Sequence, residues 1–325
     1  MNLVFRIALV MMLLASTANS LYAQGKKEDL AAAFFKAKTV AFLGDSNTYQ
    51  GEFITALEAC LIANGKKYPA ILNLGLSSET CSGDSEPGHP WPRPNVHERF
   101  ERTLAKAKPD ILFVNYGMND GIYHPFDESR FERYKAGINK IIEAAQSSDG
   151  KLKVVLVTPP PFDPLPGKLS NSLANKDAKE FGWRSIYKNY DSEVMSVYAD
   201  WILAQKDRVL ECVDIRSAIE QMLENKRKQE PDFCPSKDGV HFNSEIHKLI
   251  GLELADSLGV DPSKKLDDRL YRAIRLRQDI LRSSWLTEIG HKRPNVKPGM
   301  PLKEAQRVSR TINGLIDMAM SKDNK

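Results

Sequence analysis

The sequence predicts an α/β protein with a three-layer α/β/α architecture, in which a doubly wound, five-stranded parallel sheet precedes a helical C-terminal extension. Two observations predict the layered part. Short apolar runs rich in β-branched residues alternate with longer segments of helical spacing, and several of these runs end at a glycine. A third observation predicts the extension, because only helical spacing continues after Val260.

The elements follow in a regular order along the chain. The predicted strands are residues 39–43, 70–74, 111–115, 152–158 and 209–213. The predicted helices of the α/β region are residues 53–63, 96–107, 128–146, 191–205 and 244–258. In such a fold we expect the functional site at the carboxyl ends of the strands.

The first strand ends in the tetrapeptide Gly44-Asp45-Ser46-Asn47, and a helical segment follows. A serine at this point can present its hydroxyl above the sheet, while nearby backbone N–H groups face whatever it attacks. The alternative interpretation is that Ser46 or Asp45 simply caps the helix, which is the commoner use of these residues.

Three further blocks favour chemistry over capping. The second strand ends at Gly75, the third runs into Gly117-Met118-Asn119-Asp120, and Asp238-Gly239-Val240-His241 follows the last strand. The four blocks, in this order, resemble those of the SGNH hydrolase family, the GDSL-type esterases and lipases. The likeness covers roughly residues 38–258, with Gly-Asp-Ser-Asn where the family often has Gly-Asp-Ser-Leu.

The resemblance implies a flavodoxin-like SGNH hydrolase fold and a role for each matching residue. Ser46 would be the nucleophile, His241 the base that takes its proton, and Asp238 the carboxylate that orients the imidazole. The oxyanion hole would consist of the N–H groups of Ser46 and Gly75 and the side-chain amide of Asn119. Such a mechanism needs no cofactor and no metal.

Other interpretations of these residues stay open from the sequence. Gly75 could serve a strand-to-loop turn, and Asn119-Asp120-Gly121 is a good turn sequence. No Gly-x-Ser-x-Gly surrounds Ser46, which argues against the α/β-hydrolase arrangement. Five other histidines are interpreted as structural or surface residues: His89, His97, His124, His247 and His291.

Two long loops, residues 77–95 and 159–188, could shape a pocket. Their aromatic side chains could offer flat faces to a sugar ring or an acyl chain, or could only pack the loops down. Arg93 could hold an acidic group, although the sequence favours a surface position. The candidate substrate contacts are Asp45, Trp91, Arg93, Tyr116 and Tyr123.

The first 24 residues are typical of a signal peptide, with Arg6, an apolar core and a small-residue cleavage site. No later apolar run is long enough to span a membrane, so we expect a secreted or periplasmic protein; an uncleaved anchor is the alternative. The four cysteines permit two disulfides. A bridge between Cys212 and Cys234 would tether the loop that carries His241. Alternatively, the cysteines could be free thiols. No Cys or His spacing suggests a metal site.

The charge of the chain is uneven. Its formal net charge is +4, which argues against a general nucleic-acid role, but residues 261–325 hold 15 Lys and Arg against 8 Asp and Glu. This extension has helical spacing over 266–280 and 302–320 and contains no catalytic motif. Its helices could pack on the preceding domain, taken as residues 25–260, or its arginines could contact an anionic polymer or lipid.

These observations favour an exported serine esterase that acts on a small-molecule or polysaccharide ester, with O-acetyl groups on carbohydrate as the substrate that the family resemblance suggests. One alternative is a non-catalytic carbohydrate-binding or cell-envelope scaffold, and another is a lipase or lysophospholipase-like enzyme. A nucleotide-binding domain is disfavoured, because no Gly-x-Gly-x-x-Gly or Gly-Lys-Ser/Thr loop follows a strand.

Overall fold

The computed structural model describes residues 30–148, 150–165, 172–264 and 267–323. In these ranges a five-stranded sheet has the order β2-β1-β3-β4-β7, and every neighbouring pair is parallel. Its strands are β1 (Thr39–Gly44), β2 (Ala70–Asn73), β3 (Ile111–Asn115), β4 (Lys153–Val157) and β7 (Glu211–Val213). The predicted fold class and all five predicted strands are confirmed.

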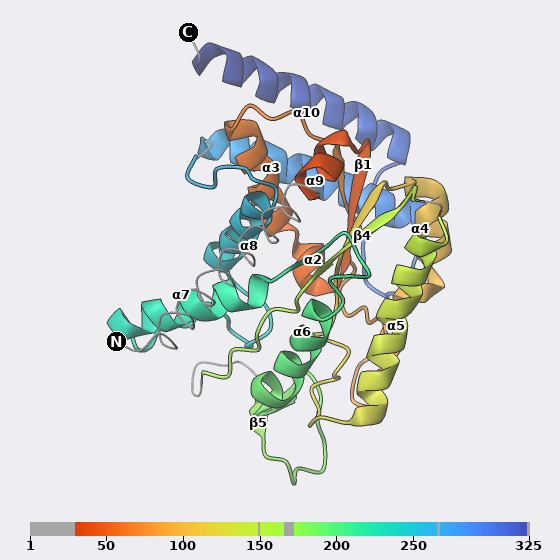
Figure 1. The fold of residues 1–325 in the computed structure, drawn as a ribbon, viewed down its shortest axis with the longest axis vertical. Coiled ribbons are helices and arrows are strands. Elements are labelled where there is room, and N and C mark those ends of the chain that lie inside the picture. Colours follow the sequence, from red (N-terminus) through yellow and green to blue (C-terminus); the bar gives the residue numbers. More distant parts are fainter. Residues whose placement is uncertain (1–29, 149, 166–171, 265–266, 324–325) are drawn as a thin grey trace, which may run out of the picture.

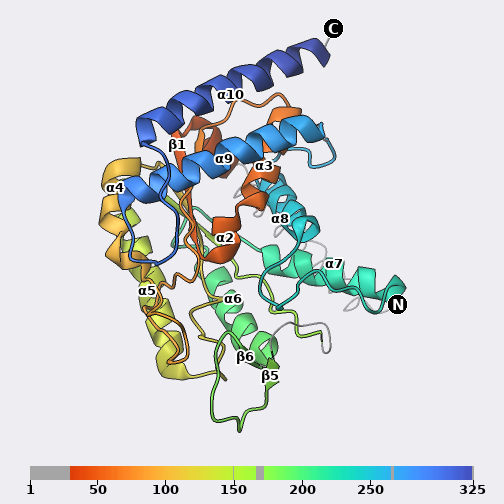
Figure 2. The same ribbon diagram turned by 180° about the vertical axis from the view of Figure 1, so that it is seen from behind.

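Helices cover both faces of the sheet, as Figure 1 and the reverse view in Figure 2 show. One face packs against α4 (Phe100–Ala107), α5 (Glu128–Gln146) and α6 (Ser196–Leu203). The other packs against α3 (Glu52–Ala63), α7 (Ile215–Gln229) and α8 (Ser244–Ser257). Each face has its own buried apolar cluster, so the sheet is covered on both sides, as a parallel sheet requires.

Several shorter elements were not predicted. The predicted helix at 96–107 is divided into the 3₁₀ turn η1 (Val96–Glu98) and α4, and the one at 191–205 into the π-helical turn η2 (Asp191–Met195) and α6. A five-residue helix, α2 (Ser46–Gln50), directly follows β1. Within the second long loop, β5 (Ser172–Ala174) and β6 (Ser185–Tyr187) form a separate parallel pair.

The extension consists of α9 (Asp268–Ile289) and α10 (Leu302–Asp323). In Figures 1 and 2, α10 lies outermost, with α9 between it and the rest of the chain. The α9 helix packs on α3 and on β2, which is an edge strand of the sheet, and Gln278 Nε2 donates to the carbonyl of Ile71 in that strand at 3.3 Å. The helix therefore covers an edge that would otherwise be open to pairing.

The predictions about a signal peptide, membrane-spanning segments and disulfides concern the surroundings of the chain. The predicted signal peptide lies outside the described residues. Among the helices of the described ranges, none combines the length and apolar character needed to cross a bilayer. The structure joins none of the four cysteines, all within the described ranges, in a disulfide; the Sγ of Cys234, for example, donates to the carbonyl of Ser236 at 2.9 Å.

Candidate active site

The carboxyl end of β1 places Ser46 at the first position of α2. Asp45 caps this helix, since its Oδ1 accepts the N–H of Asn47 at 3.0 Å. The strand and helix meet tightly at Gly44, where a Cβ would lie 2.2 Å from Thr48 Oγ1 and 2.6 Å from the Asn115 carbonyl. The glycine thus lets the chain turn directly from strand to helix, which leaves the Ser46 hydroxyl at the edge of the sheet.

The loop before α8 returns His241 to this edge. Ser46 Oγ and His241 Nε2 are 2.7 Å apart, and His241 Nδ1 lies 2.7 Å from Asp238 Oδ2. With Nδ1 donating to the carboxylate, Nε2 is left to accept the serine proton, which is the tautomer that a general base needs. The three side chains predicted from separate blocks therefore form one continuous hydrogen-bonded chain.

A tight turn holds the histidine in place. The other oxygen of Asp238 accepts the backbone N–H groups of Val240 and His241 at 2.9 and 2.8 Å. Gly239 adopts a φ of +77°, and a Cβ there would lie 2.4 Å from the ring of Phe162. Asn47 Nδ2 also donates to the Val240 carbonyl at 3.2 Å, so the residue after the serine links α2 to the histidine turn.

The electrostatics of the three acidic and basic groups differ. Burial alone would lower the pKa of His241, but the hydrogen bond and charge of Asp238 outweigh it and leave that pKa raised. The pKa of Asp238 is lowered despite its partial burial, because it accepts hydrogen bonds from the imidazole and from two backbone N–H groups. Burial raises the pKa of Asp45 to about 7, since its carboxyl is enclosed and has no basic side chain bonded to it.

The serine and histidine open into a cavity of about 300 Å³. A second cavity, of about 340 Å³, shares His241, Tyr123 and Trp183 with the first, so these residues separate the two spaces. The first cavity is lined by Ser46, Ser77, Ser78, His89, Pro90, Trp91, Arg93, Asn119, Tyr123, Trp183, His241 and Arg293. Aromatic rings and polar groups thus surround the hydroxyl together.

Asn119 lies in the turn after β3 and lines the same cavity. Its Oδ1 accepts the hydroxyl of Tyr123 at 2.8 Å, and its Nδ2 donates to the Glu79 carbonyl at 3.2 Å. An amide nitrogen has two protons, so this arrangement fixes the orientation of the side chain and leaves one N–H for a ligand. Asn119 thus shares the cavity with Ser46, and its role as an oxyanion donor stays a prediction.

Gly75 does not reach the cavity. Its N–H donates to Asn73 Oδ1 at 3.0 Å, and a Cβ at this position would lie 2.5 Å from the backbone nitrogen of Tyr49. The glycine therefore allows the chain to pass close to α2, and the prediction that its N–H contributes to the oxyanion hole needs correction.

Ser78 is instead a candidate for the donor expected of Gly75. It lines the cavity, its φ is +67°, and its backbone N–H has no partner among the described residues. Sequence reasoning missed it because nothing in a serine pair signals a left-handed conformation, which non-glycine residues seldom adopt. An oxyanion donor can thus come from a residue with a side chain, since the backbone supplies the N–H.

Two candidate substrate contacts prove to be buried beneath the site. Tyr116 is 1% exposed, and its hydroxyl donates to Glu79 Oε2 at 2.6 Å, within a buried ion pair of Glu79 with Arg99. Asp45 is 2% exposed and serves as the cap of α2. Neither side chain lines the cavities that contain His241, so the prediction that they touch substrate is corrected.

The other three candidates, Trp91, Arg93 and Tyr123, do line the cavity. The preference for a surface position of Arg93 is wrong, because the residue is only 6% exposed. Its Nε and Nη2 donate to the two carboxylate oxygens of Glu86 at 2.6 and 2.7 Å, and its guanidinium lies over the ring of Tyr123. The charge of Arg93 is therefore already balanced by a carboxylate.

The remaining histidines do not compete with His241. Burial lowers the pKa of all five, and only His89 lines the cavity, where its Nδ1 contacts the Trp91 carbonyl. Within the described ranges no group of three His, Cys, Asp or Glu side chains is arranged to hold a metal ion.

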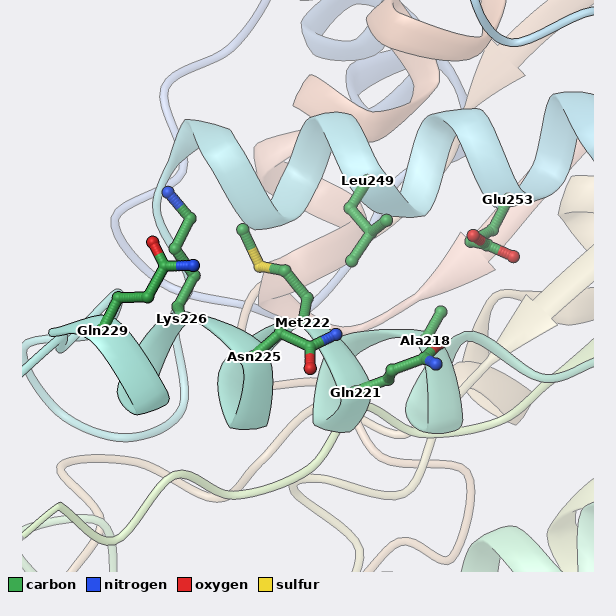
Figure 3. A pocket seen from close by; sticks show the side chains of 8 residues that line it. All are labelled: Ala218, Gln221, Met222, Asn225, Lys226, Gln229, Leu249 and Glu253. Atoms are coloured by element: carbon green, nitrogen blue, oxygen red, sulfur yellow. The ribbon is translucent and has the colours of Figure 1, made fainter. Parts of the chain in front are cut away.

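A cavity of about 410 Å³ lies elsewhere, between α7 and α8, as Figure 3 shows. Met222 and Leu249 point into it from the two helices, and amide and charged side chains surround them. It contains no serine, cysteine or histidine, so nothing there resembles a nucleophile with its base.

Comparisons with known proteins identify the family of the chain. Residues 42–249 match the model of the GDSL-like lipase/acylhydrolase family. No curated protein matches the chain.

Solved structures of similar fold include a gut microbial diltiazem-metabolizing enzyme (15% identity, TM-score 0.51, covering 68% of this chain and 47% of that one). This chain thus spans about half the length of that enzyme. Another is the acetyl xylan esterase AlAXEase, with 19% identity and a TM-score of 0.46, where the match covers 67% of this chain and 98% of that one. A third is the M. smegmatis aryl esterase, with 19% identity and a TM-score of 0.45, where the match covers 69% of this chain and 99% of that one. At these identities the likeness concerns the fold alone.

Proposed function

The chain belongs to the GDSL-like lipase/acylhydrolase family and is a carboxylic ester hydrolase, and from that premise we propose that it is an exported serine esterase that removes O-acetyl groups from carbohydrate. The observation that carries the proposed mechanism is the contact of Ser46 Oγ with His241 Nε2, with Asp238 behind the imidazole. A non-catalytic scaffold would have no use for this arrangement.

The reaction proceeds in two halves. Ser46 Oγ attacks the ester carbonyl carbon while its proton passes to His241 Nε2; the imidazolium then protonates the leaving alcohol as the C–O bond breaks. A water molecule, deprotonated by the same nitrogen, attacks the acyl-serine, and the proton returns to Ser46 as the carboxylic acid leaves. Asp238 stabilises the imidazolium in both halves.

Three donors suit the oxyanion that forms at each attack. The N–H of Ser46 at the start of α2, the N–H of Ser78 and the free N–H of the Asn119 amide all belong to residues that line the cavity around the hydroxyl. Removal of one such donor typically costs about 3 kcal/mol of barrier lowering. The hole is held before substrate arrives, because Tyr123 and Glu79 fix the Asn119 side chain.

The walls of the cavity support a carbohydrate substrate. Trp91 and Trp183 offer aromatic surface, which suits the apolar face of a sugar ring and leaves its hydroxyls free. A volume of about 300 Å³ leaves room for a small acyl group and one ring. The signal-peptide pattern of residues 1–24 supports export.

The test of the nucleophile is Ser46→Ala, measured with 4-nitrophenyl acetate and with acetylated xylan. We expect kcat to fall by at least about 10³-fold, because no hydroxyl is left to attack the ester. A small residual rate is expected, since the other residues still bind and polarise the ester. Ser257→Ala, in α8 and away from the cavity, is the matched control and should keep full activity. Full activity of a folded Ser46→Ala protein, checked by circular dichroism, would refute the assignment.

A further inference from the structure

One side chain of the catalytic cavity comes from outside the matched family domain. Arg293 lies in the link between α9 and α10, beyond residue 249, where the family match ends, and it lines the same cavity as Ser46 and His241. The extension therefore supplies part of the wall of the active site. An arginine in such a place raises the question of what it binds.

The link that carries Arg293 is held firmly to the domain. Arg102 Nε donates to the Ile289 carbonyl at 2.9 Å, Lys292 pairs with Glu98 at 2.9 Å, and the N–H of Gly299 donates to Thr287 Oγ1 at 2.8 Å. These contacts fix the link on both sides of Arg293. The guanidinium is thus delivered to the cavity by a tethered segment.

The guanidinium itself is oriented by two neighbours. Its Nε donates to the Ser77 carbonyl at 3.2 Å, and its plane lies over the Trp91 ring, 4.9 Å from the centroid. The Nη1 group contacts the carbonyl of Pro294. Since a guanidinium has five N–H donors in a fixed fork, donors remain for a ligand in the cavity.

Arg293 also differs from the other charged groups of the cavity in its partners. Arg93 is paired with Glu86, and His241 with Asp238. No ion pair found in the described part of the chain includes Arg293. Burial lowers the pKa of Arg293, which has no described carboxylate partner to oppose this effect. The pKa of Arg93 is raised instead, because its pairing with Glu86 outweighs burial. The cavity therefore carries one positive charge that no described carboxylate balances.

We infer that Arg293 binds a carboxylate on the alcohol half of the substrate, so that the preferred substrates are O-acyl esters of acidic sugars. This inference rests on the proposed esterase function and adds a substrate class to it. A planar guanidinium matches a carboxylate in a two-point hydrogen bond, and its stacking on Trp91 fixes the plane in which that carboxylate must lie.

The experiment compares two matched esters, an O-acetylated methyl glucuronoside and the corresponding methyl glucoside, which differ only in the carboxylate. For the wild-type chain we expect kcat/KM to be about 10- to 100-fold higher for the acidic ester, the range that a hydrogen bond to a charged group supplies. Arg293→Gln should bring this ratio close to one while leaving kcat/KM for the neutral ester within about threefold.

Two controls separate recognition from general effects. Lys297→Gln removes a positive charge from an exposed position of the same link and should leave the ratio unchanged. Arg293→Lys keeps the charge but not the planar fork and should give an intermediate ratio. A ratio that is already one in the wild type, or that survives Arg293→Gln, overturns the inference.

A binding measurement keeps this inference separate from the proposed function. Saturation-transfer NMR with the unacetylated methyl glucuronoside and methyl glucoside needs no turnover. Selective binding of the glucuronoside that Arg293→Gln abolishes sustains the inference even if neither ester is cleaved, in which case carbohydrate deacetylation fails. Equal binding of the two sugars, or binding of neither, overturns the role of Arg293.

Discussion

Asp45 and Ser46 are neighbours in the chain, yet the fold gives them separate tasks. The hydroxyl of Ser46 lines the cavity, whereas the carboxyl of Asp45 is buried beneath it and caps α2. Burial raises the pKa of Asp45 to about 7, and the charge of Asp45 acts in turn to raise the pKa of His241. The residue before the nucleophile can therefore tune the base without touching substrate.

Asp45→Asn tests this coupling. The amide oxygen can still accept the N–H of Asn47, so the cap is kept while the charge is removed. Without that negative charge the imidazolium of His241 is less favoured and its pKa falls. Because only the neutral imidazole accepts the serine proton, the acid limb of kcat/KM against pH should move to lower pH. A limb that stays in place or moves upward would contradict the coupling.

At this scale the sequence predicted the residues that its motifs contain and missed those that three-dimensional packing selects. Ser46, Asn119, Asp238 and His241 were all identified, because each stands in a short block. Gly75 was assigned from the family resemblance and Ser78 was not considered, because the left-handed φ of Ser78 has no local sequence signal.

Near the site, α3 packs closely against α8. A Cβ on Gly251 of α8 would lie 2.5 Å from the Ala56 Cβ and from the Phe53 carbonyl of α3. In this interface His247 is fully buried and stacks on the Phe53 ring, with a centroid distance of 6.1 Å. Neither ring nitrogen of His247 has a described partner, and burial lowers its pKa to about 4.

His247 should therefore make the protein less stable in mild acid. Its pKa is about 4 when folded and 6.5 when unfolded, so the unfolded chain binds the proton more readily and unfolding is favoured as pH falls below 6.5. Between pH 7 and pH 5 this removes about 2 kcal/mol. The free energy of unfolding of His247→Leu, measured by urea unfolding at both pH values, should fall between pH 7 and pH 5 by about 2 kcal/mol less than that of the wild type. Equal losses would show that folding does not lower the pKa of His247.

Among the elements, the strands and the long helices were predictable and the irregular ones were not. The five strands are short apolar runs, and α5 has a long apolar stripe with Asp127 as its cap. The α7 helix was missed although Ile215, Ile219 and Leu223 have helical spacing, because its last turns are highly charged. The short parallel pair β5–β6 depends on contacts with the rest of the molecule, which no local pattern encodes.

At the scale of the whole molecule, the extension and the family domain share one buried polar junction. Glu58 of α3 pairs with Arg277 of α9, and Gln278 Nε2 donates to the same carboxylate at 2.8 Å. The side chains of Glu58 and Arg277 are each only 4% exposed. The junction also contacts the edge strand β2, since Gln278 donates to the carbonyl of Ile71. Loss of its charge balance would therefore affect both the extension and the family domain.

Arg277→Met tests whether the two parts form one cooperative unit. Removing one partner of a buried ion pair leaves Glu58 uncompensated, at a cost of about 3–5 kcal/mol in the free energy of unfolding. If α9 and the catalytic domain unfold together, esterase activity and far-ultraviolet circular dichroism should be lost at the same urea concentration, and the variant should shift both midpoints equally. Arg272→Met, an exposed arginine of the same helix, is the control and should shift neither. Activity that survives a first transition seen by circular dichroism would instead mean that the extension melts separately, and Arg293 would then leave the cavity before the catalytic domain unfolds.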